Sequence, residues 1–190
     1  MQHPCHQLGC GHELLGHEEV QKWLDLLSEK SPKLVEELIP NTISINQLLK
    51  VLQALLREQV PVRDMRTIAE TLAAHGNKNA DTMSLTAVVR SSLSRQIVQN
   101  IVGQDPNLPV ITLEPALEQL LLQSQAQAQK AGAEDGSYIE PQLAERLKNS
   151  LVNVARQQEA KGKPMVLLVA APIRHILYQF VRFNVPDMRV

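Results

Sequence analysis

The residues best suited to chemistry lie together at the start of the chain. His3, Cys5, Cys10 and His12 carry the imidazole and thiol groups that bind zinc in many proteins. Their spacing matches neither a C-x2-C pair nor the H-x3-5-H signature of zinc sites. We therefore predict that residues 1–11 form a flexible leader without a metal. A Cys/His metal-binding regulator stays as an alternative.

The rest of the sequence holds no familiar catalytic motif. We find no phosphate-binding loop, no G-x-G-x-x-G after a strand, no H-E-x-x-H and no G-x-S-x-G. Acid–base side chains such as His75, His175, Asp64 and Glu70 lie in or beside amphipathic helices, where they are normally solvated or cap a helix. Catalysis needs several such groups to converge. We predict no enzyme, no catalytic residues and no cofactor, with a small α/β enzyme as an alternative.

One connection lies where α/β proteins often bind ligands. Val169–Ile173 joins a predicted strand to a predicted helix, the position at which open sheets bind their cofactors. It lacks the glycines that let a phosphate approach backbone N–H groups. We predict an ordinary tight connection. A bound anion or cofactor there would favour the enzyme alternative.

The charge balance argues against nucleic acid as a partner. A formal net charge of -1 gives no long-range attraction to phosphates. The predicted helices over 44–57 and 64–75 can be mistaken for a helix-turn-helix, but the second carries Asp64 and Glu70 beside Arg66. These carboxylates repel phosphates as much as Arg66 attracts them. We predict no nucleic-acid binding.

The sequence also shows no membrane segment. No apolar stretch approaches the ~20 residues that a spanning helix needs, and the N-terminus has no long apolar core of the signal-peptide type. Aromatic residues make up only 3% of a chain that is 44% hydrophobic, so aliphatic side chains must fill the core. We expect a soluble, cytoplasmic and mostly helical protein.

Residues 12–103 are predicted to form a helical subdomain. The firmest helix covers 44–57, because Ser44 can cap it and Gln47 stands three residues later, as in a capping box. Apolar residues at helical spacing predict three further helices. These begin near Gly16, Asp64 and Ser84 and end near Pro32, Gly76 and Gly103.

The pattern changes after a linker at residues 104–109, and 110–190 are predicted to form a small α/β subdomain. Strands are expected at Val110–Leu113, at Met165–Ala170 with cover on both faces, and from Met188. Helices are expected to start at Pro115, Pro141 and Pro172, with a mobile loop over Ala131–Gly136. The fold class is therefore mainly α with a small α/β part, a helical subdomain followed by a subdomain with a short sheet.

The segment Leu52–Leu72 places unusual charges at the start of a helix. Arg63, Asp64 and Arg66 cluster there, and arginine gains nothing from the positive end of the helix dipole. An acidic group should therefore compensate the positive charge of these arginines. Two interpretations stay open: a contact with a partner or neighbouring subunit, or a salt bridge within the chain to Glu58, Glu70 or Glu37.

The same segment, LQALLREQVPVRDMRTIAETL, resembles a characteristic stretch of the FlhA family of flagellar type III export-gate proteins, also called FHIPEP. Further pieces similar to the family follow in order, and together they cover residue 12 to the end. They are Glu13–Gly16, Pro32–Pro40, Leu85–Arg90, Val110–Leu113, Leu117–Leu121, Val166–Val169 and Ile173–Arg174. An ordered set of this length is far more specific than any single motif.

The resemblance implies the third, helical subdomain and most of the fourth, α/β subdomain of the family's cytoplasmic region, truncated after Val190. It implies a non-enzymatic docking module in a ring of commonly nine subunits, on the cytoplasmic side of an inner-membrane gate. Chaperone–substrate complexes, the ATPase complex and neighbouring subunits are the partners it implies. The membrane-spanning helices and two earlier subdomains of family members have no counterpart here. The best candidates for partner or intersubunit contacts are Arg63, Asp64, Arg66 and Arg90.

Overall fold

The computed structural model describes residues 15–105, 107–130 and 139–190, without the side chains of 128–130. The chain divides into two compact units, one ending at Asn100 and the other beginning at Ile101. The leader, the zinc candidates and the loop at 131–136 lie outside the described residues. The exact subdomain boundaries at 12–103 and 110–190 stay a prediction.

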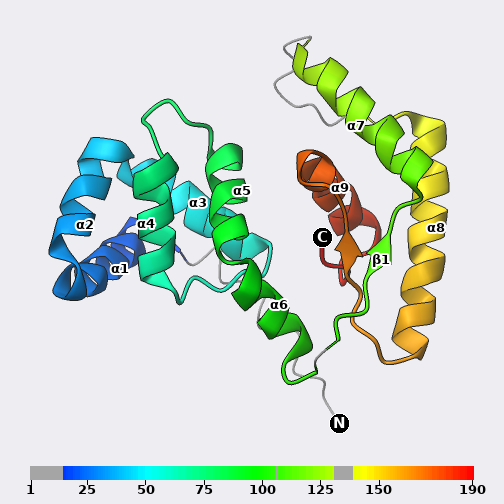
Figure 1. The fold of residues 1–190 in the computed structure, drawn as a ribbon, viewed down its shortest axis with the longest axis horizontal. Helices are drawn as coiled ribbons and strands as arrows, with labels where there is room; N and C mark the ends of the chain where they lie inside the picture. The colour runs from blue at the N-terminus through cyan, green and yellow to red at the C-terminus, as the bar shows by residue number, and fades with distance from the viewer. Residues whose placement is uncertain (1–14, 106, 131–138) are drawn as a thin grey trace. The chain divides into compact units, whose positions relative to one another are not determined.

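The first unit is built from helices (Figure 1). α4 and α5 pack side by side, and both α1 and α5 pack against α3. The helices are α1 (His17–Lys30), α2 (Pro32–Glu36), the π-helical segment η1 (Glu37–Thr42), α3 (Ile45–Arg57), α4 (Met65–His75), α5 (Thr82–Ser92) and α6 (Ser94–Val102).

The predicted capping box at the start of α3 is confirmed. The Ser44 hydroxyl accepts from the Gln47 backbone N–H at 3.2 Å, and the Ser44 backbone N–H donates to the Gln47 side chain at 2.9 Å. Two N–H groups that the helix itself leaves unpaired are thereby satisfied. α3 then buries Leu48, Leu52 and Leu55 completely, each contributing roughly 1.5–3 kcal/mol of hydrophobic free energy. α3 is thus the centre of this unit's core.

The prediction of one continuous helix over 84–102 is wrong. The helix breaks at Leu93 into α5 and α6, and α5 begins at Thr82 with Asp81 as its cap. The Ser92 hydroxyl donates back to the Val88 carbonyl at 3.3 Å, a bond that commonly bends helices. Leu93 is itself buried, with 1% of its surface exposed. The bend therefore keeps Leu93 in the core, whereas none of the α6 side chains is fully buried.

The second unit is a small α/β arrangement. Strands β1 (Ile111–Thr112) and β2 (Leu167–Leu168) pair in parallel, with Ile111 opposite Leu167. A parallel bridge between Val166 and Arg189 adds a third segment to the sheet. The helices of this unit are α7 (Pro115–Lys130), α8 (Pro141–Ala160) and α9 (Ala171–Asn184). The fold class, mainly α with a small α/β part, is confirmed (Figure 1).

The predicted strand over 165–170 is shorter than expected and is not covered on both faces. Only Leu167 and Leu168 pair as a strand with β1. Leu167 is buried at 1% exposure, whereas Leu168 on the opposite face is 57% exposed. Side chains alternate between the two faces of a sheet, so an apolar run alone cannot show that one face lacks a covering element.

Across residues 15–105, 107–130 and 139–190, no helix has the length and apolar character needed to cross a membrane.

Candidate protein-docking site

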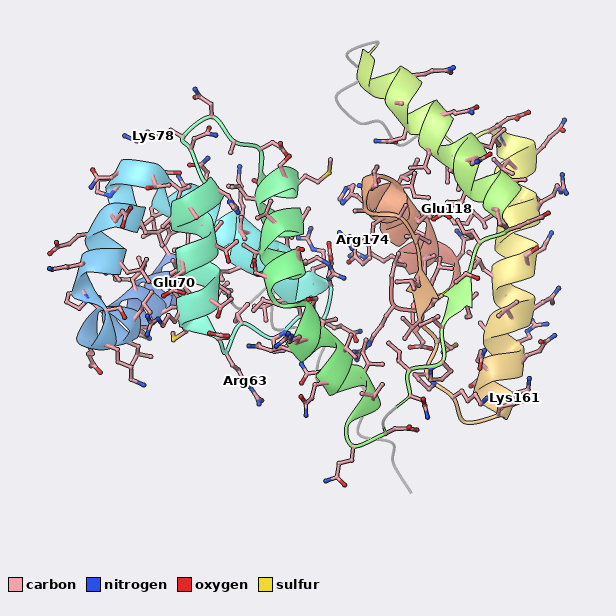
Figure 2. The ribbon with its side chains drawn as sticks, in the orientation of Figure 1. Arg63, Glu70, Lys78, Glu118, Lys161 and Arg174 are labelled. Carbon is pink, nitrogen blue, oxygen red and sulfur yellow. The ribbon has the colours of Figure 1, made fainter. Side chains whose placement is uncertain are left out.

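Arg63 lies just before α4 and is exposed. Figure 2 shows its side chain extending away from the helices. Within the part of the chain that the structure covers, Arg63 forms no ion pair. The positive end of the α4 dipole lies beside it and disfavours a cation. An exposed arginine in this position is well suited to bind a carboxylate from another molecule.

Asp64 is the N-terminal cap of α4, as predicted. Its carboxylate accepts from the Thr67 backbone N–H at 3.1 Å and from the Thr67 hydroxyl at 2.7 Å. It also accepts from the Gln96 amide of α6 at 2.6 Å. Desolvation raises the pKa of Asp64, but these hydrogen bonds outweigh it and hold the pKa below its ordinary value. The carboxylate therefore positions α4 and attaches α6 to it.

Arg66 has an acidic partner on its own helix. Its guanidinium donates to the Glu70 carboxylate at 2.7 Å, four residues along α4. Both side chains are well exposed, at 72% and 50%. The hydrogen bond to Glu70 and its negative charge raise the pKa of Arg66. Such an exposed pair adds little stability, so the Arg66 guanidinium stays accessible to a partner.

Arg90 lies in a different environment from the other three candidates. Its guanidinium on α5 is 2.7 Å from the Glu58 carboxylate at the end of α3, and the two side chains are only 13% and 6% exposed. Arg90 therefore joins α3 to α5 inside the unit. A direct contact between Arg90 and a partner stays a prediction.

Gln47 has a second role that the sequence motif did not reveal. Besides completing the capping box, its side-chain amide donates to the carbonyls of Asn77, Lys78 and Ala80 at 3.1–3.3 Å. The loop between α4 and α5 is thereby fixed to the start of α3. These partners lie some thirty residues away, so local spacing carries no signal of the contact.

The strand-to-helix connection at Val169–Ile173 is occupied by a side chain of the protein itself. The Glu118 carboxylate of α7 accepts from the Ala170 backbone N–H at 2.9 Å, at the start of α9. A helix N-terminus attracts anions because its N–H groups are unpaired. Here Glu118 supplies the negative charge, which is consistent with the ordinary tight connection predicted for this position.

No catalytic cluster is found in the described part of the chain. A pocket of about 240 Å³ between α7 and α8 is lined by aliphatic, amide and serine side chains, with Glu140 the one ionisable group among the lining residues. Groups of three or more potential metal ligands are absent from the residues with described positions. The charged start of α4 is therefore the strongest candidate for a partner-binding site.

Comparison with known proteins shows the family of this chain. The chain is 43% identical to the flagellar biosynthesis protein FlhA of Salmonella typhimurium and 42% identical to that of Proteus mirabilis, each over 94% of this chain. It spans about a quarter of the length of these relatives, 25% and 24% respectively. The FHIPEP family model matches residues 9–190. The chain belongs to the FHIPEP family, whose members are components of export apparatus and not enzymes.

Solved structures with the same fold come from type III secretion. The nonameric EscV cytosolic domain from the type III secretion system matches with a TM-score of 0.78 and 26% identity, over 95% of this chain and 52% of that one. The complex of the Chlamydia pneumoniae CdsV and CdsO proteins matches with a TM-score of 0.74 and 29% identity, over 94% and 52%.

Proposed function

We propose that this chain is a non-enzymatic docking and ring-forming module of a bacterial flagellar type III export apparatus. The observation that carries the proposal is its 42–43% identity to flagellar FlhA proteins across 94% of its length. The fold it shares with a nonameric cytosolic domain supports a role as one subunit of a ring. The module would act on the cytoplasmic side of an inner-membrane export gate.

Its proposed partners are neighbouring subunits and cytoplasmic export components, namely chaperone–substrate complexes and the ATPase complex. The structure of CdsV with CdsO supports a partner of this kind, because a protein of the same fold is found there in a complex. Proteins, rather than nucleic acid, fit the net charge of -1.

The proposed contact surface is the start of α4. Arg63 provides an exposed cation without an ion-pair partner among the described residues, and Arg66 provides a second cation paired only at the surface. Asp64 holds the helix start in place through Thr67. Arg90 holds α5 to the end of α3 through its ion pair with Glu58.

A pull-down of cognate cytoplasmic export components tests docking. We expect the wild-type chain to retain such a component, and Arg63→Glu and Arg66→Glu to lose most of it. Lys161→Glu, an equal charge change at the exposed end of α8, is the control and should bind as wild type. Circular dichroism checks that each variant is folded. Retention by both α4 variants at the wild-type level would show that the start of α4 is not the docking site.

A further inference from the structure

Charge is unevenly distributed along the second unit. Residues 114–145 carry six acidic side chains and one basic side chain, a net charge of -5. Residues 146–190 carry eight basic and two acidic side chains, a net charge of +6. The second range holds most of α8 together with β2 and α9. The positive charge of this unit is therefore concentrated in its later part.

The fold brings two of the basic stretches to one end of the unit. After α8 the chain turns through Lys161 and Lys163 before β2 begins, with Lys161 at the end of the helix (Figure 2). After α9 the chain returns to the same end, because the Arg189 backbone N–H donates to the Met165 carbonyl at 2.9 Å, two residues after Lys163. Arg182 lies in the last turn of α9. Lys161, Lys163 and Arg182 are called here the basic end.

The charges of the basic end are not compensated by other side chains. All three residues are exposed, and none forms an ion pair within the part of the chain that the structure covers. The stretches around them, 156–163 and 182–189, hold five basic and two acidic side chains, a net charge of +3. The C-terminal ends of α8 and α9 tolerate cations because each carries roughly -0.5 of an elementary charge. Two such partial charges offset only part of the positive charge.

An exposed aromatic side chain lies at the same end. Phe183 follows Arg182 in the last turn of α9 and is 82% exposed, the highest value among the large apolar side chains that the structure describes. Phenylalanine is usually buried, because its ring removes a large apolar area from water. A ring left in water beside unpaired cations indicates a surface that another structure covers.

An anionic membrane surface fits this combination of side chains. Basic residues are attracted to the negatively charged cytoplasmic leaflet, and aromatic rings enter the boundary between headgroups and acyl chains. Nucleic acid fits less well, because Glu159 and Asp187 lie within the same two stretches and repel a fixed line of phosphates. A lipid surface is fluid, so neutral lipids can gather beneath those carboxylates.

We propose that the basic end binds an anionic lipid membrane peripherally, with Phe183 in the interfacial layer and the three cations beside lipid phosphates. The proposal rests on the location proposed above, on the cytoplasmic side of an inner membrane, and adds a second contact site to the docking surface at α4. Binding should weaken with salt, because the Debye length falls from roughly 10 Å at 0.1 M to roughly 3 Å at 1 M.

Vesicle co-sedimentation of the full chain tests the proposal. We expect phosphatidylcholine vesicles with about 30% phosphatidylglycerol to bind at least about tenfold more tightly than vesicles of phosphatidylcholine alone. Lys161→Glu with Lys163→Glu should weaken this binding at least about tenfold. Arg146→Glu with Lys148→Glu is the matched control, because it makes the same charge change on α8 roughly three turns away from the basic end. Circular dichroism checks that each variant is folded.

Fluorescence of a Phe183→Trp variant tests the position of the ring. Its emission should move to shorter wavelength when anionic vesicles are added, because the indole leaves water for the interfacial layer. The wild-type chain is the control, since its single tryptophan, Trp23, is already buried. Phe183→Ser should weaken vesicle binding without a change of charge. An unshifted emission in a variant that still sediments with vesicles would refute the insertion of residue 183.

The outcomes separate this inference from the proposed function. Arg63→Glu and Arg66→Glu should lose export components in the pull-down and still bind vesicles as wild type, so either proposal can fail alone. The inference is overturned if anionic vesicles are not bound at low salt, or if the Arg146 and Lys148 control loses as much binding as the Lys161 and Lys163 variant. Binding of polyglutamate in place of vesicles, lost in the Lys161 and Lys163 variant, would also overturn it and assign the basic end to an acidic protein.

Discussion

Arg90 on α5 and Glu58 at the end of α3 form an ion pair of 2.7 Å that is almost fully withdrawn from water. Glu58 caps the C-terminal end of α3, where the helix dipole is negative and disfavours a carboxylate. Arg90 supplies the compensating positive charge from a different helix. The pair therefore connects the C-terminal end of α3 to α5.

Replacing Arg90 with methionine should destabilise the helical unit by about 3–5 kcal/mol, because Glu58 would be left as a buried charge that has lost its cation. Urea unfolding followed by fluorescence measures this, since the single tryptophan, Trp23, is buried in the same unit. The matched control Arg66→Met removes an exposed pair and should cost less than about 1 kcal/mol. Equal losses in the two variants would contradict this account.

Asp64→Ala should cost more stability than Asp81→Ala, although each residue caps a helix through a serine or threonine three positions later. Loss of a cap alone costs about 1 kcal/mol. Asp64 also accepts from Gln96, and a hydrogen bond to a charged group adds about 1.5–3 kcal/mol. Gln96→Ala in the Asp64→Ala background should then have little further effect. Additive losses in the double variant would show that the two residues are not coupled.

The stability of the helical unit should fall in acid as the caps become protonated. The pKa of Asp81 is lowered chiefly by its hydrogen bond with Ser84, and that of Asp64 by Thr67 and Gln96 against an opposing desolvation. A lowered folded-state pKa gives stability that is complete above the ordinary value of 3.8 and is lost as the pH falls through the folded-state pKa.

Thermal melting between about pH 5 and pH 2 measures this loss. The wild-type melting temperature should fall more steeply below the ordinary carboxyl pKa than that of a variant with Asp64→Asn and Asp81→Asn. Parallel profiles for the two proteins would mean that other carboxylates cause the acid sensitivity.

Gln47→Glu should destabilise the unit more than a change of one atom suggests. The new carboxylate keeps an acceptor for the Ser44 N–H but loses the amide donor that bonds three loop carbonyls. The bonds to the Asn77 and Lys78 carbonyls are exposed, so water can replace the lost donor there, whereas the bond to the Ala80 carbonyl is partly buried. A partly buried acceptor left without a donor costs about 1–3 kcal/mol. Hydrogen exchange of residues 77–80 should accelerate, whereas Gln21→Glu on the exposed face of α1 should leave it unchanged. Unchanged protection in Gln47→Glu would contradict the anchoring role.

Local signals in the sequence predict the helix starts well. Ser44 with Gln47, and Asp64 with Thr67, act within one helical turn, so spacing alone reveals them. The break at Leu93 escapes this reasoning because the apolar period continues through it. The exposure of Leu168 escapes it as well, because cover on a sheet face depends on elements distant in the chain.

Sequence reasoning likewise predicted only part of the candidate site. Sequence reasoning found the charged cluster at Arg63, Asp64 and Arg66, and it offered Glu70 as one internal partner, which Arg66 indeed contacts. It did not separate Arg90 from the exposed arginines, because burial is set by the packing of α3 on α5. Gln96 was missed for a related reason, since its bond to Asp64 crosses between helices.

The parallel pairing of β1 with β2 also determines when each unit can be completed during synthesis. Chains emerge from the ribosome N-terminus first, and the described core of the helical unit is made of residues no later than Ile97 in α6. β1 must wait for α7 and α8 before β2 appears, and the bridge to Arg189 forms only after α9 has been made. A ribosome that stalls late would therefore hold a finished helical unit followed by a strand with no sheet to join.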